Sequence, residues 1–393
     1  MSNNLPLMST YSYLPVNLVT GEGSYLFDDK GNKYIDFTSG IGVNSLGYGD
    51  KEWIQAITDT VSTLQHTSNI FLNEKALTLA EKLVEITKMD KVFLCNSGAE
   101  ANEGAIKLAR KYSFDKYGLN RHKVLTLKQS FHGRTLATLT ATGQDKFHNY
   151  FFPFPDGFDY VEANNVQDFK NKASNEVCAI IMEAIQGEGG VHPLDSDFVK
   201  EVYDTCKEKD IILIFDEVQC GIGRTGKVFG YEYYDVKPDI VTVAKGLGAG
   251  LPIGGFLCTK KLSQTFNPGD HGTTFGGNPV VCSGALVVLE KLCTENALKE
   301  IEEKGQYLKS LLKNINSSIV KDVRGNGLMI GIEVTVPPAE IQKKALEKGL
   351  LVLTAGKNVV RLLPPLVISK EEIEAGARII ECIINEYCIM DNA

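Results

Sequence analysis

The chain has 393 residues, of which 43% are hydrophobic and 23% are charged, a mix typical of a soluble globular protein with two or three domains. Its net charge of −8, without any block of Lys and Arg, argues against a nucleic-acid partner, because binding phosphates needs clustered cations. No apolar run reaches the length of a membrane span, and the start, MSNNLPLMST, lacks the pattern of a signal peptide. We therefore expect a cytoplasmic protein that does not bind membranes.

The cysteines are scattered and form no C-x-x-C pair. Their odd number and their spacing argue against a disulfide framework and against a zinc site, so we expect a reducing compartment and no bound metal. The nine positions are Cys95, Cys178, Cys206, Cys220, Cys258, Cys282, Cys293, Cys382 and Cys388.

Strands and helices alternate through the first two thirds of the chain. Residues 20–37 predict a hairpin around the turn at 29–32. Continuous apolar strands separated by helices predict an α/β fold with a mostly parallel sheet that is covered on both faces. The expected strands are 91–96, 124–127, 177–184, 211–218, 240–244 and 254–258, and the expected helices between them include 99–112 and 198–209.

The last hundred residues have a different pattern, which predicts a smaller α+β domain. It begins with a long amphipathic helix and ends with another. The expected elements are a helix over 295–315, strands near 327–334, a helix over 339–348, a hairpin at 350–363 and a final helix. We place 1–45 with this small domain as an N-terminal segment, 46–292 in a large domain and 293–393 in the small domain.

One glycine-rich segment, 221–226, matches the dinucleotide-binding pattern G-x-G-x-x-G and follows a strong strand. That site requires a helix immediately afterwards, whose N-terminus meets the pyrophosphate. Here the sequence continues KVFGYEYYDVKPD, which is poorly helical. The segment therefore favours a plain loop, and a nicotinamide-dependent oxidoreductase remains a distant alternative.

Strand ends carry the residues that suggest chemistry. Asp216 ends a buried strand, where a carboxylate needs a partner such as a pyridinium nitrogen, although it could also cap the following loop. Strand alternation places Val218 on the same face. Lys245 follows the strand 240–244 and precedes small residues, which leaves room for an imine, although a surface lysine would look the same.

Two further strand ends complete the set. Backbone N–H groups at 96–100, where a helix begins, suit an anion, although a plain N-cap is also common there. Phe131 could stack on a heteroaromatic ring or pack in the core. Arg134 could hold a carboxylate with two hydrogen bonds or form a weak surface ion pair.

Together these segments resemble the class III (subgroup II) aminotransferases, and most of all the members that act on N-acetylornithine. The resemblance runs from the N-terminal hairpin to the final helix. It implies a fold-type I transferase that depends on pyridoxal 5′-phosphate, with a seven-stranded type of sheet in its large domain, and a homodimer with shared active sites. The segments are NSGAEANEGAIKLARKY, SFHGRTLATLTATG, EAIQGEGGVHP, IFDEVQCGIGRTG, VAKGLGAGLPIGG and HGTTFGGNP.

The resemblance also implies a role for each motif residue. Lys245 would carry the cofactor as a Schiff base, and Asp216 would pair with its ring nitrogen. The other implied cofactor contacts are Gly98 and Ala99 at the phosphate, Phe131 and Val218 on the two ring faces, Gln219 at the ring hydroxyl and Thr274 at the phosphate of the neighbouring protomer. The implied substrate contacts are Arg134 at the α-carboxylate, Thr273 near the substrate and Glu188 with Arg361 as a gate, a pair that could also be a structural salt bridge.

One departure from the relatives bears on the substrate. Gly40 stands where ornithine δ-aminotransferases resemble one another in having Tyr, which opens room for an acyl group on the donor. The resemblance therefore implies transfer of the δ-amino group of N2-acetyl-L-ornithine to 2-oxoglutarate, giving N-acetyl-L-glutamate 5-semialdehyde and glutamate in arginine biosynthesis. Succinylornithine, N-succinyl-diaminopimelate, ornithine and 4-aminobutyrate remain alternative donors.

Overall fold

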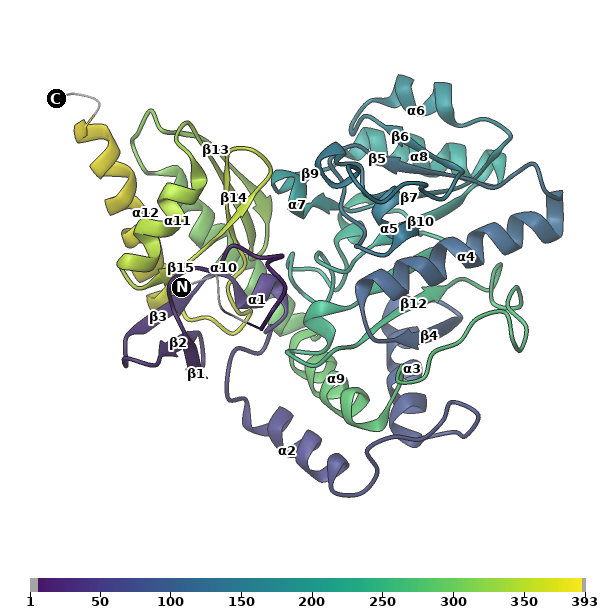
Figure 1. Cartoon of the computed structure of the whole chain (residues 1–393), viewed down its shortest axis with the longest axis horizontal. Coiled ribbons are helices and arrows are strands. Elements are labelled where there is room, and N and C mark those ends of the chain that lie inside the picture. Colours follow the sequence, from purple (N-terminus) through teal and green to yellow (C-terminus); the bar gives the residue numbers. More distant parts are fainter. Residues whose placement is uncertain (1–5, 391–393) are drawn as a thin grey trace.

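The computed structural model describes residues 6–390, and for 388–390 it describes the backbone only. Its centre is a seven-stranded sheet in which only β12 runs antiparallel to its neighbours (Figure 1). This arrangement confirms the predicted α/β class with a mostly parallel sheet. In spatial order the strands are β4 (Lys91–Cys95), β12 (Gly254–Cys258), β11 (Ile240–Val243), β10 (Ile212–Asp216), β7 (Val177–Met182), β5 (Lys123–Leu127) and β6 (Phe158–Val161).

Helices cover both faces of this sheet, which explains why its strands are apolar without alternation. Ile212 and Ile214 of β10 belong to the buried cluster that includes the helix α4 (Gly98–Tyr117). Leu213 and Phe215, which alternate with them, belong to the cluster that includes the helices α8 (Ser196–Lys209) and α9 (Pro279–Leu292). The carboxyl ends of the central parallel strands therefore open at one edge between these layers.

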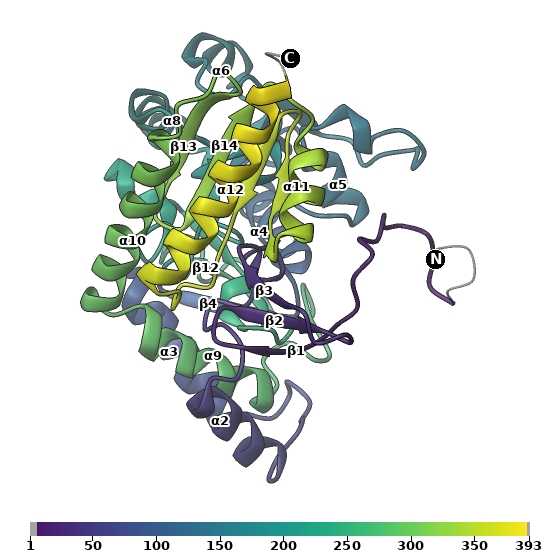
Figure 2. The ribbon, with the colours of Figure 1, turned by 90° about the vertical axis from the view of Figure 1, so that its left-hand side faces the viewer.

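A second sheet is built from the C-terminal part of the chain, and helices cover one side of it (Figure 2). Its order is β13 (Val320–Asn326), β14 (Met329–Val334), β17 (Val359–Leu362) and β16 (Leu353–Ala355). The helices are α10 (Glu295–Lys313), α11 (Pro338–Glu347) and α12 (Lys370–Met390).

The N-terminal hairpin lies beside this C-terminal part, although the two are far apart in sequence. β15 (Leu350–Leu351) pairs in parallel with β3 and extends the N-terminal sheet. That sheet contains β1 (Leu18–Glu22), β2 (Tyr25–Asp28) and β3 (Lys33–Asp36). The domain boundaries at residues 45 and 292 stay a prediction.

The remaining elements are short or connect the layers. They are α1 (Ser39–Gly42), α2 (Lys51–Val61), α3 (Glu74–Thr87), α5 (Leu136–Ala141), η2 (Asp145–Phe147), α6 (Val166–Lys172), β8 (Ile185–Gln186), α7 (Gly187–Gly190), β9 (His192–Pro193), η3 (Gly230–Tyr234) and η4 (Lys245–Leu247). The eight cysteines whose side chains are described are free thiols, and the side chain of Cys388 lies outside that set. Within residues 6–390, no helix combines the length and the apolar character needed to cross a membrane.

Candidate active site

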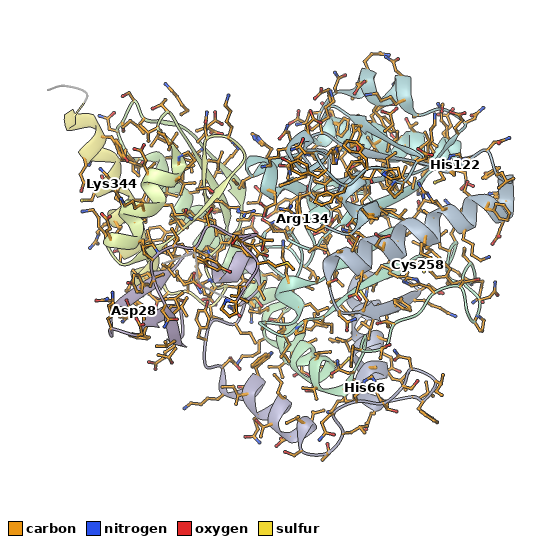
Figure 3. The ribbon with its side chains drawn as sticks, in the orientation of Figure 1. Asp28, His66, His122, Arg134, Cys258 and Lys344 are labelled. Atoms are coloured by element: carbon orange, nitrogen blue, oxygen red, sulfur yellow. The ribbon has the colours of Figure 1, made fainter. Side chains whose placement is uncertain are left out.

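A cavity of about 440 Å³ lies at the carboxyl edge of the large sheet. Figure 3 shows Arg134, which lines the cavity, near the middle of the molecule. Seven other residues of the predicted site line the same cavity: Gly98, Ala99, Phe131, Asp216, Val218, Gln219 and Lys245. The sequence-based grouping of strand ends into one site therefore matches a real concavity.

Lys245 is separated from the end of β11 by Ala244 and is partly buried in the cavity wall. Its φ of 44° lies in the left-handed region, which is strained for a residue with a side chain. Burial is the largest cause that lowers the pKa of its ammonium group, and nearby Arg361 adds to the effect against the opposing charge of Glu188. A lowered pKa favours the neutral amine, which is the nucleophilic form.

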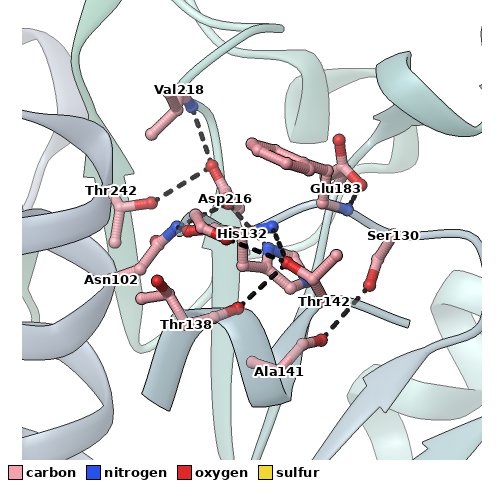
Figure 4. Close-up of polar contacts among 12 residues, drawn as sticks. Asn102, Ser130, His132, Thr138, Ala141, Thr142, Glu183, Asp216, Val218 and Thr242 are labelled. Carbon is pink, nitrogen blue, oxygen red and sulfur yellow. Dashed lines mark hydrogen bonds and ion pairs between the residues drawn. The ribbon is translucent and has the colours of Figure 1, made fainter. Parts of the chain in front are cut away.

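Asp216 ends β10 and is only 3% exposed. Its Oδ2 accepts hydrogen bonds from Asn102 Nδ2 and from His132 Nδ1, both at 2.7 Å (Figure 4). Its Oδ1 accepts one from the Val218 amide at 3.0 Å and one from Thr242 Oγ1 at 3.5 Å. Because the carboxylate can only accept, the short bond requires the proton of His132 to be on Nδ1.

Val218 reaches the cavity for a different reason from the predicted one. The strand β10 ends at Asp216, so strand alternation does not extend to residue 218. Instead, the Val218 amide bonds back to the side chain of Asp216 and closes a turn. This turn brings Val218 to the wall of the same cavity.

The N-terminus of α4 lies in the wall of the cavity. Ser97 Oγ accepts from the Glu100 amide at 3.2 Å, and the Ser97 carbonyl accepts from the Ala101 amide at 3.1 Å. The first amides of a helix have no carbonyl partner within it, so those of Gly98 and Ala99 remain available for an anion. A Cβ built on Gly98 would lie 2.7 Å from Val218 Cγ1, so a larger residue here must displace the Val218 side chain.

Glu188 and Arg361 form the predicted pair, with 2.7 Å between Oε1 and Nη1. Arg361 is 2% exposed and also donates to Gln219 Oε1 at 3.1 Å. Burial tends to raise the pKa of Glu188, but the charges of Arg361, Lys245 and Lys146 outweigh it and hold that pKa below its ordinary value. The charges of Glu188 and Arg361 both act on the pKa of Lys245, so the pair lies near the predicted Schiff-base lysine.

Five predicted residues do not line the cavity formed by this chain: Glu188, Arg361, Thr273, Thr274 and Gly40. Thr273 and Thr274 lie on the loop before α9, where Thr273 Oγ1 accepts from Asn96 Nδ2 at 3.3 Å and Thr274 is exposed. Gly40 is exposed with a φ of 62°. Asn44 separates Gly40 from the cavity-lining Gly250, since its side chain lies within 3.4 Å of a Cβ built on either glycine.

Sequence reasoning missed several cavity residues because it considered each motif only through its family role. Asn102 and His132 orient Asp216 across 114 and 84 residues of sequence. Glu183 lines the cavity and accepts from the amides of Phe131 and Gly187 at 3.0 and 3.3 Å. Burial raises the pKa of Glu183 to about 7. Glu183 directly follows an apolar strand, which is a sequence signal, whereas Asn102 lies inside α4 and has no such signal.

The glycine-rich segment 221–226 is a loop, as predicted, and no α-helix follows it directly. Arg224 within it is buried and donates to the carbonyls of Leu328 and Pro364 at 3.0 and 2.5 Å. The segment therefore joins the large sheet to the C-terminal part of the chain, and its geometry does not offer a helix N-terminus to a pyrophosphate.

The site residues fit pyridoxal phosphate. A buried carboxylate with fixed orientation, two available amides at a helix N-terminus, a lysine whose pKa is lowered by burial and two apolar walls are the groups that its ring nitrogen, phosphate, aldehyde and ring faces require. Gln219 lies beside them in the same cavity.

Comparisons with known proteins agree with this site. The family model "Aminotransferase class-III" matches residues 8–384. An acetylornithine aminotransferase of Caldanaerobacter subterraneus subsp. tengcongensis is 49% identical over 97% of each chain. Among solved structures, an ornithine aminotransferase from Toxoplasma gondii is similar with a TM-score of 0.93 at 30% identity, over 98% of this chain and 94% of that one. An N-acetylornithine aminotransferase from Stenotrophomonas maltophilia is similar with a TM-score of 0.85 at 35% identity, over 97% and 98%. The chain belongs to the class-III aminotransferases, which depend on pyridoxal 5′-phosphate.

Proposed function

We propose that the protein is an acetylornithine aminotransferase. It transfers the δ-amino group of N2-acetyl-L-ornithine to 2-oxoglutarate, giving N-acetyl-L-glutamate 5-semialdehyde and L-glutamate, a step of arginine biosynthesis in the cytoplasm. The observation that carries this proposal is the Arg361–Glu188 ion pair beside Lys245. The 49% identity with a protein of that name, against 30% with an ornithine aminotransferase, supports the choice of donor.

The ion pair accounts for the use of two different substrates in one site. 2-Oxoglutarate carries two carboxylates, whereas N-acetylornithine carries one. With Glu188 in place, the charge of Arg361 is neutralised and the site suits the donor. When Glu188 moves away, the Arg361 guanidinium binds the second carboxylate of 2-oxoglutarate, so the buried cation is paired in both states.

The other residues position groups and move protons. When bound, pyridoxal phosphate supplies the carbon that accepts the amino group and the ring that withdraws electrons. With the cofactor bound, Lys245 would take a proton from the δ-carbon of the donor and deliver it to the cofactor carbon that receives the amino group, because its lowered pKa keeps the amine available as a base. Asp216 holds the proton on the ring nitrogen, and Arg134 binds the α-carboxylate of the donor.

The absence of a side chain at Gly40 supports an N-acylated donor. Asn44 lies between Gly40 and Gly250 at the edge of the cavity, and Gly40 adds no side chain there. An aromatic side chain at residue 40 would occupy this region. It would also be strained, because the φ of 62° is one that side-chain-bearing residues rarely adopt.

A homodimer completes the proposal. An exposed apolar segment, Ile70 to Leu72, lies next to the loop of Thr274, because Asn69 Nδ2 donates to the carbonyls of Thr273 and Gly276 at 3.0 and 3.1 Å. Ile70 and Leu72 are each 83% exposed, which is unusual for large apolar side chains in one short segment. A second copy that covers this segment would receive Thr274 at its own cofactor phosphate.

The half-reaction with single amines tests the proposed donor. The loss of absorbance at about 420 nm is followed after the purified holoenzyme is mixed with one amino donor at a time. The donors are N-acetylornithine, succinylornithine, N-succinyl-diaminopimelate, ornithine and 4-aminobutyrate. The largest rate constant per unit concentration is expected for N-acetylornithine. A higher value for ornithine or 4-aminobutyrate would contradict the proposal, and an absence of that absorbance with a response to nicotinamide cofactors would favour an oxidoreductase.

A further inference from the structure

Phe147, which the family motifs do not include, lies against the guanidinium of Arg134. The guanidinium carbon lies 4.1 Å from the centroid of the Phe147 ring and 5.6 Å from that of Phe131. A cation over an aromatic face within about 6 Å is attracted by the electrons of the ring. The two rings meet edge to face, with centroids 6.1 Å apart and an interplanar angle of 75°. The guanidinium of Arg134 therefore packs against two aromatic rings that meet edge to face.

The hydrogen-bonding capacity of Arg134 is unused in this arrangement. Its guanidinium makes no hydrogen bond or ion pair with the part of the chain that the structure describes, and it lines the cavity. A guanidinium held by its face still presents a planar set of N–H groups at its edge, which matches the two oxygens of a carboxylate. An exposed arginine without such a support would lose more rotamer freedom when a ligand binds.

Phe147 is itself tied to the loop that carries Arg134. Its amide donates to the Gln144 carbonyl at 3.0 Å, and Gln144 Nε2 donates to the Ser130 carbonyl at 2.9 Å. The Gly143 amide donates to Ser130 Oγ at 3.1 Å. Because Ser130 directly precedes Phe131, the ring of Phe147 and the guanidinium that it supports are fixed to the same short piece of backbone.

We propose that Phe147 is a positioning residue that sets the preference of the enzyme for amino donors with an α-carboxylate. It holds the guanidinium of Arg134 by its face and leaves the N–H groups free for the carboxylate oxygens. The inference rests on the carboxylate-binding role of Arg134 in the proposed function. It adds a residue that touches neither the cofactor nor the reacting carbon but determines which donors bind well.

The test compares two donors that differ only in the carboxylate, N-acetylornithine and N-acetylputrescine. Phe147→Leu keeps an apolar side chain and removes the aromatic face. It is expected to raise the KM for N-acetylornithine roughly threefold to tenfold, the range of one cation–aromatic contact, with kcat nearly unchanged. The KM for N-acetylputrescine should not change, and Phe147→Tyr, which keeps the ring, should restore the wild-type values.

A matched control removes a cation–aromatic contact on α8, outside the active-site cavity. Tyr203 on α8 lies 4.6 Å from the ammonium of Lys207, so Tyr203→Leu should leave the KM of both donors unchanged. An equal change of KM for both donors in Phe147→Leu would show a general structural effect and overturn the inference. No change for either donor would overturn it as well.

Two further measurements separate this inference from the proposed function. Arg134→Gln should abolish the preference for the carboxylated donor. If Arg134→Gln abolishes this preference but Phe147→Leu does not reduce it, the proposed function stands and the inference fails. If Arg134→Gln leaves the preference intact, the inference fails together with the assigned role of Arg134. If the wild type uses ornithine but not N-acetylornithine, the proposed substrate is wrong, and ornithine with putrescine serves as the donor pair for the same test of Phe147.

Discussion

The Arg361–Glu188 ion pair puts one buried cation where a carboxylate of the chain or of a substrate can neutralise it. In Glu188→Ala, Arg361 keeps its hydrogen bond to Gln219 but has no anionic partner during the donor half-reaction, and a buried charge without a counter-charge is costly. We expect the half-reaction with N-acetylornithine to slow roughly tenfold or more, and the half-reaction with 2-oxoglutarate to change much less. Stopped-flow absorbance with each substrate alone measures both.

The control for this variant breaks an exposed ion pair. Glu85 and Lys82 are paired at 2.9 Å on the surface of α3, where such pairs contribute little. Glu85→Ala should leave both half-reactions unchanged. Equal slowing of the two half-reactions in Glu188→Ala would rule out the gate and leave a structural salt bridge.

Glu217 gives the stability of the protein a pH dependence. Burial raises its pKa from an ordinary 4.5 to about 8, against the amides of Gly230 and Tyr231 that donate to it. Between pH 4.5 and about 8, Glu217 keeps its proton in the folded chain but loses it in the unfolded chain. The free energy of unfolding therefore falls as pH rises through this range. Thermal unfolding should therefore show a lower Tm at pH 8 than at pH 5.5, and a smaller difference in Glu217→Gln. A variant with the same pH difference as the wild type would contradict this assignment.

At the same scale, the sequence could predict the positions of residues at strand ends, while their roles stay a proposal. Asp216 and Lys245 each follow a continuous apolar run, which marks both as near the edge of a buried sheet. Their partners could not be predicted, because contacts such as His132 with Asp216 depend on how strands far apart in sequence are ordered in the sheet. The Arg134–Phe147 contact depends in the same way on the fold of a loop.

The start of α4 is the element whose local geometry most directly limits cofactor binding. A Cβ at residue 98 would lie 2.7 Å from Val218 Cγ1, so Gly98→Ala must displace the side chain that forms one wall of the cavity. We expect the affinity for pyridoxal phosphate to fall roughly tenfold, a value typical of a modest steric clash at a packed contact. Fluorescence titration of the apoenzyme with the cofactor measures it.

A second glycine in the same cavity region serves as the control. A Cβ on Gly246, directly after Lys245, would have its nearest contact at 3.7 Å, an ordinary van der Waals distance. Gly246→Ala should therefore bind the cofactor as the wild type does. If the two variants bind equally well, the contact between residue 98 and Val218 does not limit the site.

Helices with a single strong periodicity and the continuous apolar strands of the large sheet were predicted well, whereas one largely buried helix was not. The long amphipathic helix was expected over 295–315 and is observed as Glu295–Lys313. The helix α9 was not predicted, because it is buried on most of its surface and shows no polar stripe. Its Gly284 allows close packing of α2, since a Cβ there would lie 2.9 Å from Trp53 Nε1. The strand β13 was missed because its sequence, VKDVRGN, contains more polar than apolar residues.

For the whole molecule, the proposed dimer makes activity depend on assembly. The exposed segment around Phe71 adjoins the loop of Thr274, so a charge there should disrupt both the interface and the shared site. Phe71→Glu is expected to elute with the mass of one chain, 43.1 kDa, and to lose most of its activity, whereas the wild type elutes at about twice that mass. Light scattering coupled to gel filtration measures this.

A charge on a distant apolar residue provides the comparison for the dimer. Leu119 follows α4 and is 77% exposed, so Leu119→Glu should keep both the assembly and the activity of the wild type. A fully active Phe71→Glu monomer would contradict the shared site. The dimer was suggested only by family resemblance, because a single sequence does not reveal which exposed apolar residues meet a second copy.

The covalent attachment of pyridoxal phosphate at Lys245 is the centre of this account. Borohydride reduction of the holoenzyme, followed by proteolysis and mass spectrometry, identifies the lysine that carried the cofactor. We expect the reduced adduct on the peptide that contains Lys245, which lies strained and partly buried in the cavity between Asp216 and the Arg361–Glu188 pair. An adduct on a different lysine, or an unmodified Lys245 peptide from fully coloured protein, would contradict the account.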